Sequence, residues 1–129
     1  AEGGNSMKNY EAEQILIALK GLSESSVELS VLTAYTIIQD RVMLENQLKP
    51  YIEMKNQIIL KYSKDGTVTE KTPGFNDCLK EISAIGNEEI EAPAFKKIKP
   101  VELKAAKLPV NLVGALFPIF EERENTHGN

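Results

Sequence analysis

The sequence predicts a mainly α-helical fold of the α+β type, in which one long kinked helix packs with two or three shorter helices. We also expect a small β element near the C-terminal third. Residues 25–62 carry apolar side chains at helical spacing, and one further segment on each side shows the same period. From Asn87 the period changes to two, which is typical of a strand.

Length and composition indicate one domain. The chain has 129 residues, of which 42% are hydrophobic and 26% charged, as in soluble globular proteins. Residues 1–6 are small and polar ahead of a Met-Lys pair, so we interpret them as an expression remnant. We expect residues 7–120 to form a single helical domain with a small β element, and residues 121–129 to form a polar tail.

Apolar runs and cysteine content predict the compartment. The apolar runs are only a few residues long, so we expect no membrane span. The chain has one cysteine, Cys78, which has no second cysteine for an internal disulfide. Together with the lack of an apolar signal-peptide core, this indicates a reducing cytoplasm.

The first predicted helix covers Tyr10–Lys20. Its spacing of three and four residues predicts one buried face, formed by Ala12, Ile15, Leu16 and Leu19. Gly21 is expected to end the helix in a left-handed conformation, with Leu22 packing back on the last turn.

The second predicted helix begins at a capping box formed by Ser25 and Glu28. Pro50 lacks a backbone donor and crowds the preceding turn, so we expect a kink near residues 46–50. The apolar face of this helix is predicted to comprise Val27, Val31, Ala34, Tyr35, Ile38, Val42, Leu48, Ile52, Ile59 and Tyr62.

This second helix carries more apolar surface than one short neighbour can cover. Further apolar residues lie off its main face: Leu32, Ile37, Met43, Leu44, Met54, Ile58 and Leu60. Either the helix breaks and folds back, or another subunit covers it. We favour a homo-oligomer, with a dimer as the preferred state, because closed two-fold association is the commonest arrangement. The predicted interface comprises Val31, Tyr35, Ile38, Val42, Ile52 and Ile59.

Three further elements are expected in the second half of the chain. Ser63–Thr67 has a turn composition, and Val68 between two threonines suggests a short strand. Thr72-Pro73 is expected to open a helix that ends at Gly86. Its buried face would comprise Phe75, Cys78, Leu79, Ile82 and Ile85.

The C-terminal third begins with the period-two strand, in which Ile90, Ala92 and Ala94 share a side. Leu108-Pro109 then leads into a short helix whose end Pro118 tightens or breaks. The apolar contacts of this third are expected from Ile98, Val101, Leu103, Leu112, Val113, Leu116, Phe117 and Phe120.

The residues argue against an enzyme. The one histidine, His127, lies in the polar tail, so a Ser-His-Asp triad and a histidine metal site both lack their central residue. Neither a GxxxxGK[ST] loop nor a GxGxxG fingerprint occurs. Asp65-Gly66-Thr67 matches part of a phosphatase motif, but Ser63 stands where the nucleophilic aspartate would be. We expect no enzymatic activity, no cofactor, no metal, and a core position for Cys78.

A lysine cluster is the one candidate for binding an anionic partner. It comprises Lys96, Lys97, Lys99, Lys104 and Lys107. Nucleic-acid binding is not expected, because the cluster has no arginine, offers only Phe95 for stacking, and belongs to a chain of net charge -4. An acidic protein or a small anionic ligand remains open, as does a merely solubilising role.

The order of these features resembles small uncharacterised proteins of phages and prophages of Gram-positive bacteria. The likeness covers residues 7–120. It rests on a paired helical N-terminal region and a closing Leu-Pro with a short helix. Between them lie Tyr62-Ser63-Lys64-Asp65-Gly66, Phe75-Asn76-Asp77-Cys78-Leu79 and Asn87-Glu88-Glu89-Ile90-Glu91. The resemblance implies a viral or prophage origin and a location in the host cytoplasm or the virion, and it transfers no catalytic or ligand residue.

Two functions follow as hypotheses. The first is a non-enzymatic accessory protein that acts through protein–protein contacts, in assembly or in the virion, with a phage structural protein as partner. The alternative is a phage anti-defence inhibitor that binds a host defence protein or sequesters an anionic nucleotide signal near the lysine cluster. An oligomeric helical protein suits both.

Overall fold

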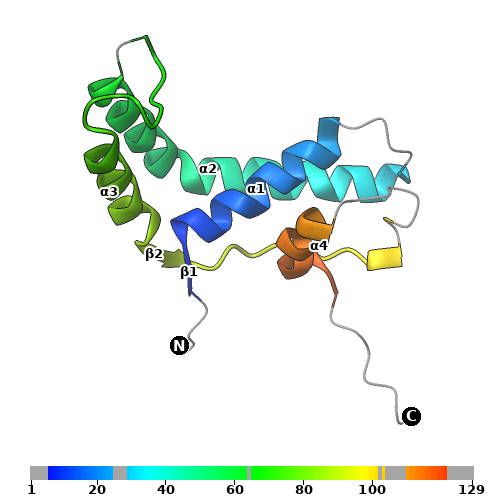
Figure 1. Cartoon of the computed structure of the whole chain (residues 1–129). Helices are drawn as coiled ribbons and strands as arrows, with labels where there is room; N and C mark the ends of the chain where they lie inside the picture. The colour runs from blue at the N-terminus through cyan, green and yellow to red at the C-terminus, as the bar shows by residue number, and fades with distance from the viewer. Residues whose placement is uncertain (1–5, 25–28, 64, 102, 104–109, 122–129) are drawn as a thin grey trace. The chain divides into compact units, whose positions relative to one another are not determined.

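The computed structural model describes residues 6–24, 29–63, 65–101, 103 and 110–121 (Figure 1). The fold is mainly helical with a small two-stranded antiparallel sheet, as predicted. In chain order the elements are strand β1 (Ser6–Lys8), helices α1 (Asn9–Glu24), α2 (Val31–Tyr62) and α3 (Phe75–Gly86), strand β2 (Glu89–Glu91), helix α4 (Val110–Leu116) and the 3-10 helix η2 (Phe117–Ile119).

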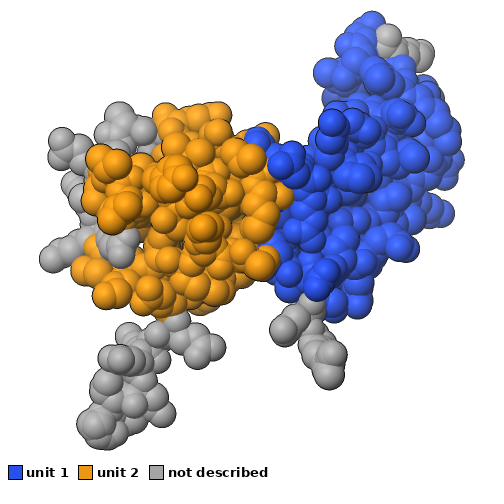
Figure 2. Space-filling view, turned by 180° about the vertical axis from the view of Figure 1, so that it is seen from behind, with its two compact units in different colours: residues 1–13, 44–93 blue, residues 14–43, 94–129 orange. Residues whose placement is uncertain are grey.

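The chain divides into two compact units, coloured blue and orange in Figure 2. Unit 1 comprises residues 1–13 and 44–93, and unit 2 comprises residues 14–43 and 94–129. Helices α1 and α2 each contribute residues to both units, whereas the sheet and α3 belong to unit 1 alone. A single domain over residues 7–120 was the expectation from length; the structure groups the same residues into two units.

The sheet in unit 1 pairs β1 with β2, with Met7 opposite Ile90. The strand predicted after Asn87 is therefore confirmed over Glu89–Glu91, but it ends there, so Ala92 and Ala94 lie outside it. Its partner strand includes Ser6, so the expectation that residues 1–6 lie outside the domain is wrong at this residue. Ser6 pairs with Glu91, and its hydroxyl donates to Glu89 Oε1 at 3.1 Å.

Helix α1 buries the face that its spacing predicts: Ala12, Ile15, Leu16 and Leu19. The predicted end at Gly21 is wrong, because α1 continues to Glu24. Leu22 is only 3% exposed, so it extends the buried face by another turn. The hydroxyl of Ser23 also donates to the carbonyl of Leu19, at 2.9 Å within this turn.

Helix α2 begins later than predicted. Its first helical residue is Val31, and Ser30 acts as the N-cap: its hydroxyl oxygen accepts from the amide of Thr33 at 3.1 Å. The predicted start at Ser25 is wrong, because residues 29 and 30 are not helical; Ser25 and Glu28 themselves lie outside the described residues. The helix then passes Pro50 without a break, and a kink there remains a prediction.

The buried face of α2 differs from the predicted one. It comprises Thr33, Ile37, Asp40, Leu44, Leu48, Tyr51 and Ile58, spaced mostly by three or four residues. Three of these, Ile37, Leu44 and Ile58, had been placed off the main face. The prediction followed apolar residues alone, whereas the real face also includes Thr33, Asp40 and Tyr51, whose polar atoms hydrogen-bond within the chain.

The segment before α3 is a turn without a strand at Val68. The predicted turn is supported by Gly66, whose φ is 81°. The predicted strand is wrong because the following backbone turns back: the amide of Thr72 donates to the carbonyl of Thr69, and the amide of Thr69 donates to Thr72 Oγ1, both at 2.9 Å.

Helix α3 begins at Phe75, so its predicted opening at Thr72-Pro73 lies two to three residues too early. Gly74 supplies the N-cap with a φ of 82°, and a Cβ there would meet the ring of Tyr62 at 2.9 Å. Cys78 is buried as predicted. Leu79 is 46% exposed and does not belong to the buried face.

In unit 2, the segment around Ile98 lies beside the end of the 3-10 helix η2. The amide of Ile98 donates to the carbonyl of Ile119, and the amide of Glu121 donates to the carbonyl of Ile98, both at 2.9 Å. Pro118 lies within η2, so the tightening expected at this proline is confirmed. The buried residues here are Ile98, Leu103, Leu116 and Ile119, whereas Val101 and Phe117 are exposed.

Candidate protein-binding face

The first half of α2 exposes apolar side chains along one side. Exposure is 84% for Val31, 58% for Tyr35, and 44% for both Ile38 and Val42. At 100° per residue, these four positions lie on the side of the helix opposite to Ile37 and its buried neighbours. Leu32, which is 77% exposed, flanks them. We define the apolar strip as Val31, Leu32, Tyr35, Ile38 and Val42.

The strip ends where α2 enters unit 1. The same side of the helix continues with Asn46, Lys49 and Glu53, all exposed and polar. The other two predicted interface residues, Ile52 and Ile59, lie in unit 1 and are half-buried. The structure thus unites four of the six predicted interface positions in the strip and leaves these two apart from it.

A hollow of about 480 Å³ adjoins the strip within unit 2. Two of its lining residues, Ile38 and Val42, belong to the strip itself, so the two features form one continuous surface. The full lining is Ile38, Gln39, Asp40, Val42, Met43, Ala94 and Lys96.

Asp40 places a buried carboxylate at the wall of this hollow. The residue is 1% exposed, and the backbone amide of Lys96 donates to its Oδ1 at 2.8 Å. Its Oδ2 is also buried and has no hydrogen-bond partner among the described residues. Burial raises the pKa of Asp40, opposed by the hydrogen bond from Lys96 and by the charges of Lys96 and Lys97. Sequence periodicity missed this residue because an aspartate was not expected on a buried face.

Of the three described members of the predicted lysine cluster, Lys96 and Lys97 lie near enough to Asp40 for their charges to lower its pKa. Lys96 reaches Asp40 through its backbone amide, and the ammonium group of Lys97 donates to the carbonyl of Pro118. Lys99 is exposed, and Lys104 and Lys107 lie outside the described residues. An anion site made by all five lysines therefore remains a prediction.

Unit 1 contains a second polar cluster, centred on Glu13 of α1. The hydroxyl of Tyr51 donates to Glu13 Oε1 at 2.8 Å, and Lys55 Nζ donates to Glu13 Oε2 at 2.6 Å. A pocket of about 360 Å³ lies beside them, lined by Tyr10, Glu13, Tyr51, Lys55, Ile82, Ser83, Gly86 and Asn87.

We assign the Glu13 cluster a role in stabilising unit 1. Burial, and then the hydrogen bond to Glu13, raise the pKa of the Tyr51 hydroxyl, which moves it further from neutral pH. Both carboxylate oxygens of Glu13 already accept a hydrogen bond. The sequence held a signal for it, since Lys55 lies at helical spacing from Tyr51 and Ile58 and is half-buried beside the buried face of α2.

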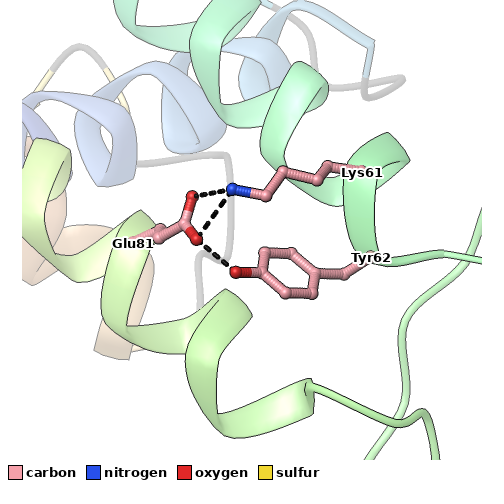
Figure 3. Close-up of polar contacts among 3 residues, drawn as sticks. All are labelled: Lys61, Tyr62 and Glu81. Atoms are coloured by element: carbon pink, nitrogen blue, oxygen red, sulfur yellow. Dashed lines mark hydrogen bonds and ion pairs between the residues drawn. The ribbon is translucent and has the colours of Figure 1, made fainter.

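A third cluster ties the end of α2 to α3 (Figure 3). Lys61 Nζ donates to both carboxylate oxygens of Glu81 at 3.0 Å, and the Tyr62 hydroxyl donates to the same group. The hydrogen bond from Tyr62, followed by that from Lys61, lowers the pKa of Glu81. These three side chains bind one another, so we assign them a role in holding unit 1 together.

The described residues contain no group of three histidine, cysteine, aspartate or glutamate side chains that could hold a metal ion. No helix among them is both long enough and apolar enough to cross a bilayer.

The comparisons with known proteins add no family. Protein-family models, curated proteins and solved structures were compared with this chain, and none of them matches it.

Proposed function

We propose that this chain is a non-enzymatic accessory protein that acts through protein–protein contacts made by the apolar strip and the adjoining hollow. The observation that carries the proposal is the exposure of the strip, from 44% at Ile38 and Val42 to 84% at Val31. A contiguous exposed apolar surface often marks an interaction site, whereas single exposed apolar residues are normal on soluble proteins. The phage-type layout of the sequence suggests a role in assembly or in the virion, and a location in the host cytoplasm or the virion.

Self-association is the simplest use of the strip. We estimate that its five side chains expose on the order of 600 Å² per copy, so two copies would bury roughly 1,200 Å², the lower edge of specific stable interfaces. Two such strips can pack against each other about a two-fold axis, because an isologous interface uses the same patch on both copies. This supports a dimer of modest affinity.

The test compares strip variants with a matched control on the same helix. In sedimentation velocity over a range of concentrations, we expect Ile38→Asp and Val42→Asp to abolish association, because each places a charge in the apolar contact. The control is Leu60→Asp. Leu60 is also apolar and 65% exposed on α2, but it lies in unit 1 away from the strip, so this variant should associate like the wild type.

Several outcomes would contradict this proposal. A wild-type chain that is monomeric at every concentration would exclude the dimer, and the strip would then have to bind another protein. A pull-down with the wild type and Ile38→Asp identifies that protein: a phage structural protein supports the accessory role, and a host defence enzyme supports the anti-defence alternative. Equal recovery of a partner by both proteins would exclude the strip as the binding surface.

A further inference from the structure

The apolar strip has the residue spacing of a coiled-coil seam. Val31, Tyr35, Ile38 and Val42 are separated by four, three and four residues, which is the alternating spacing of the two core positions of a heptad repeat. Each of the four is at least 44% exposed. A seam of this kind is covered by a second helix that lies almost along the first.

A second copy of α2 supplies a matching helix. Its own strip has the same spacing, and the five strip residues carry no charge, so two strips bring no like charges together where they meet. Pairing them buries roughly 1,200 Å², which reaches the lower edge of stable interfaces. The area alone does not say in which direction the second helix runs.

The hollow lies on one flank of this seam, and Leu32 lies on the same flank. Leu32 precedes Gln39 by seven residues and Met43 by eleven, so at 100° per residue the three side chains point to the same side of α2 within about 20°. Gln39 and Met43 line the hollow together with Ala94. Leu32 is 77% exposed, so this flank carries an exposed apolar side chain at one end and a hollow at the other.

The direction of the second helix determines what faces the hollow. In an antiparallel pair, the two-fold axis brings each flank against the same flank of the other copy, whereas a parallel pair brings it against the opposite flank. With Tyr35 opposite Ile38 of the second copy, an antiparallel pair places Leu32 beside Gln39 of the second copy and at its hollow. A parallel pair places Ala34 there, and its single methyl group is too short to reach into the hollow.

We propose that two copies pair their apolar strips antiparallel and that Leu32 of each copy occupies the hollow of the other. The proposal rests on the proposed function, since it specifies how the strip associates. On the opposite flank, the same register sets Ala34 against Arg41 of the second copy, so a small side chain faces a large one there as well. The contact of Leu32 with the hollow fixes the direction and the register of the dimer.

Disulfide cross-linking of Val31→Cys and Val42→Cys measures the direction of the helices. In the antiparallel dimer, position 31 of one copy lies opposite position 42 of the other. Two cysteines at the same position are then offset by eleven residues, about 16 Å along the helix, whereas a disulfide needs Cα atoms within about 7 Å. After oxidation of the mixed variants, we expect the mixed dimer and little dimer of either variant with itself. Isotope labelling of one variant distinguishes these products by mass.

Two controls accompany the cross-linking. The wild type, in which Cys78 is buried, gives the background without an added cysteine. Sedimentation velocity before oxidation checks that both variants still associate. Disulfide dimers of each variant with itself would show a parallel pair and overturn the proposal. Variants that associate but give no mixed dimer would overturn the register.

Truncation of Leu32 tests its contact with the hollow. Leu32→Ala should raise the dimer Kd at least about tenfold, a change of about 1.4 kcal/mol, because each dimer loses two such contacts. The matched control is Leu60→Ala, which truncates an exposed leucine of α2 in unit 1 and should leave the Kd unchanged. Equal Kd values for Leu32→Ala and the wild type would overturn the proposal.

A change of size inside the hollow completes the test. Ala94→Phe adds a ring at an exposed lining residue and should also weaken association, because it takes the space of Leu32. The double variant with Leu32→Ala should associate more tightly than Ala94→Phe alone, since the ring then meets a truncated side chain. Additive losses in the double variant would contradict the placement of Leu32 in the hollow.

The failure of this inference can be separated from failure of the proposed function. If Ile38→Asp abolishes association while the cross-links show a parallel pair, the strip is an interface and the placement of Leu32 is wrong. If the wild type is monomeric at every concentration, the dimer and this inference are both wrong, and the strip is left to another protein. If strip variants change neither association nor the recovery of a partner, the proposed function itself is wrong.

Discussion

The two halves of α2 differ in how their buried polar groups are paired and in which residues their opposite sides expose. In unit 1, the polar residues on or beside its buried face have partners within the chain: Tyr51 and Lys55 bind Glu13, and Tyr62 binds Glu81. The opposite side of that half is exposed and mostly polar, with Leu60 as an exposed apolar residue. In unit 2, buried Asp40 keeps one oxygen without a described partner, and the opposite side is the apolar strip.

This difference indicates which unit pairs its polar groups within the chain and which unit retains surface for a binding partner. Every buried side-chain polar atom among the described residues of unit 1 has a hydrogen-bond partner, and the side of α2 that continues the strip is mostly polar there. Unit 2 exposes the apolar strip, which a binding partner can cover, and has two buried polar atoms without a partner among the described residues, Asp40 Oδ2 and Arg41 Nε. Features that cost stability in the free chain are those commonly retained for function.

The strongest way to break the comparison is to put a charge on each side of α2. Ile58 is 6% exposed in unit 1, so Ile58→Asp should lower the free energy of unfolding by more than about 4 kcal/mol, because it buries an unpaired carboxylate. Ile38→Asp should change it by less than about 1 kcal/mol at concentrations where the wild type is monomeric. Urea denaturation followed by circular dichroism measures both. Similar losses in the two variants would mean that the strip is a core face.

The second prediction concerns the Glu13 cluster. Glu13→Leu leaves Tyr51 and Lys55 without their shared acceptor, and we expect the free energy of unfolding to fall by about 2 kcal/mol. The matched control, Glu53→Leu, removes an exposed carboxylate from α2 and should cost less than about 0.5 kcal/mol. If Glu13→Leu costs no more than this control, the cluster does not stabilise unit 1 and its pocket regains interest as a ligand site.

The fold class could be predicted because helical and strand periods depend on local spacing. The face of α1 and the strand near Ile90 were found in this way. The buried face of α2 was not, because Asp40, Tyr51 and Lys55 lie on or beside it and look like interruptions in a sequence. Only the fold shows that the amide of Lys96 and the carboxylate of Glu13 reach these residues.

The candidate site was predictable in part. Surplus apolar residues on α2 identified Val31, Tyr35, Ile38 and Val42, because more apolar positions were present than one helix face can bury. The hollow could not be foreseen: it requires Ala94 and Lys96 to lie beside Ile38 and Asp40, which are more than fifty positions away in the chain. Contacts at such separations leave no periodic trace.

The smallest expected effect concerns Asp40 and gives the comparison its sharpest test. Burial raises the pKa of Asp40 above its ordinary value of 3.8, so the folded chain holds this proton more tightly than the unfolded chain. In linkage terms, Asp40 therefore lowers the free energy of unfolding as pH rises from 3.8 through the raised pKa, and the loss is constant above it.

Asp40→Asn removes this loss while keeping an Oδ1 acceptor for the amide of Lys96. We expect the variant to be more stable than the wild type by about 1 kcal/mol at pH 7 and equally stable at pH 3, where the wild-type carboxyl is protonated in both states. Urea denaturation at the two pH values measures the difference. A variant less stable than the wild type at pH 7 would show that the ionised Asp40 is already compensated in the free chain. The contrast with unit 1 would then rest on the exposed strip and on Arg41 Nε, the other buried polar atom without a partner among the described residues.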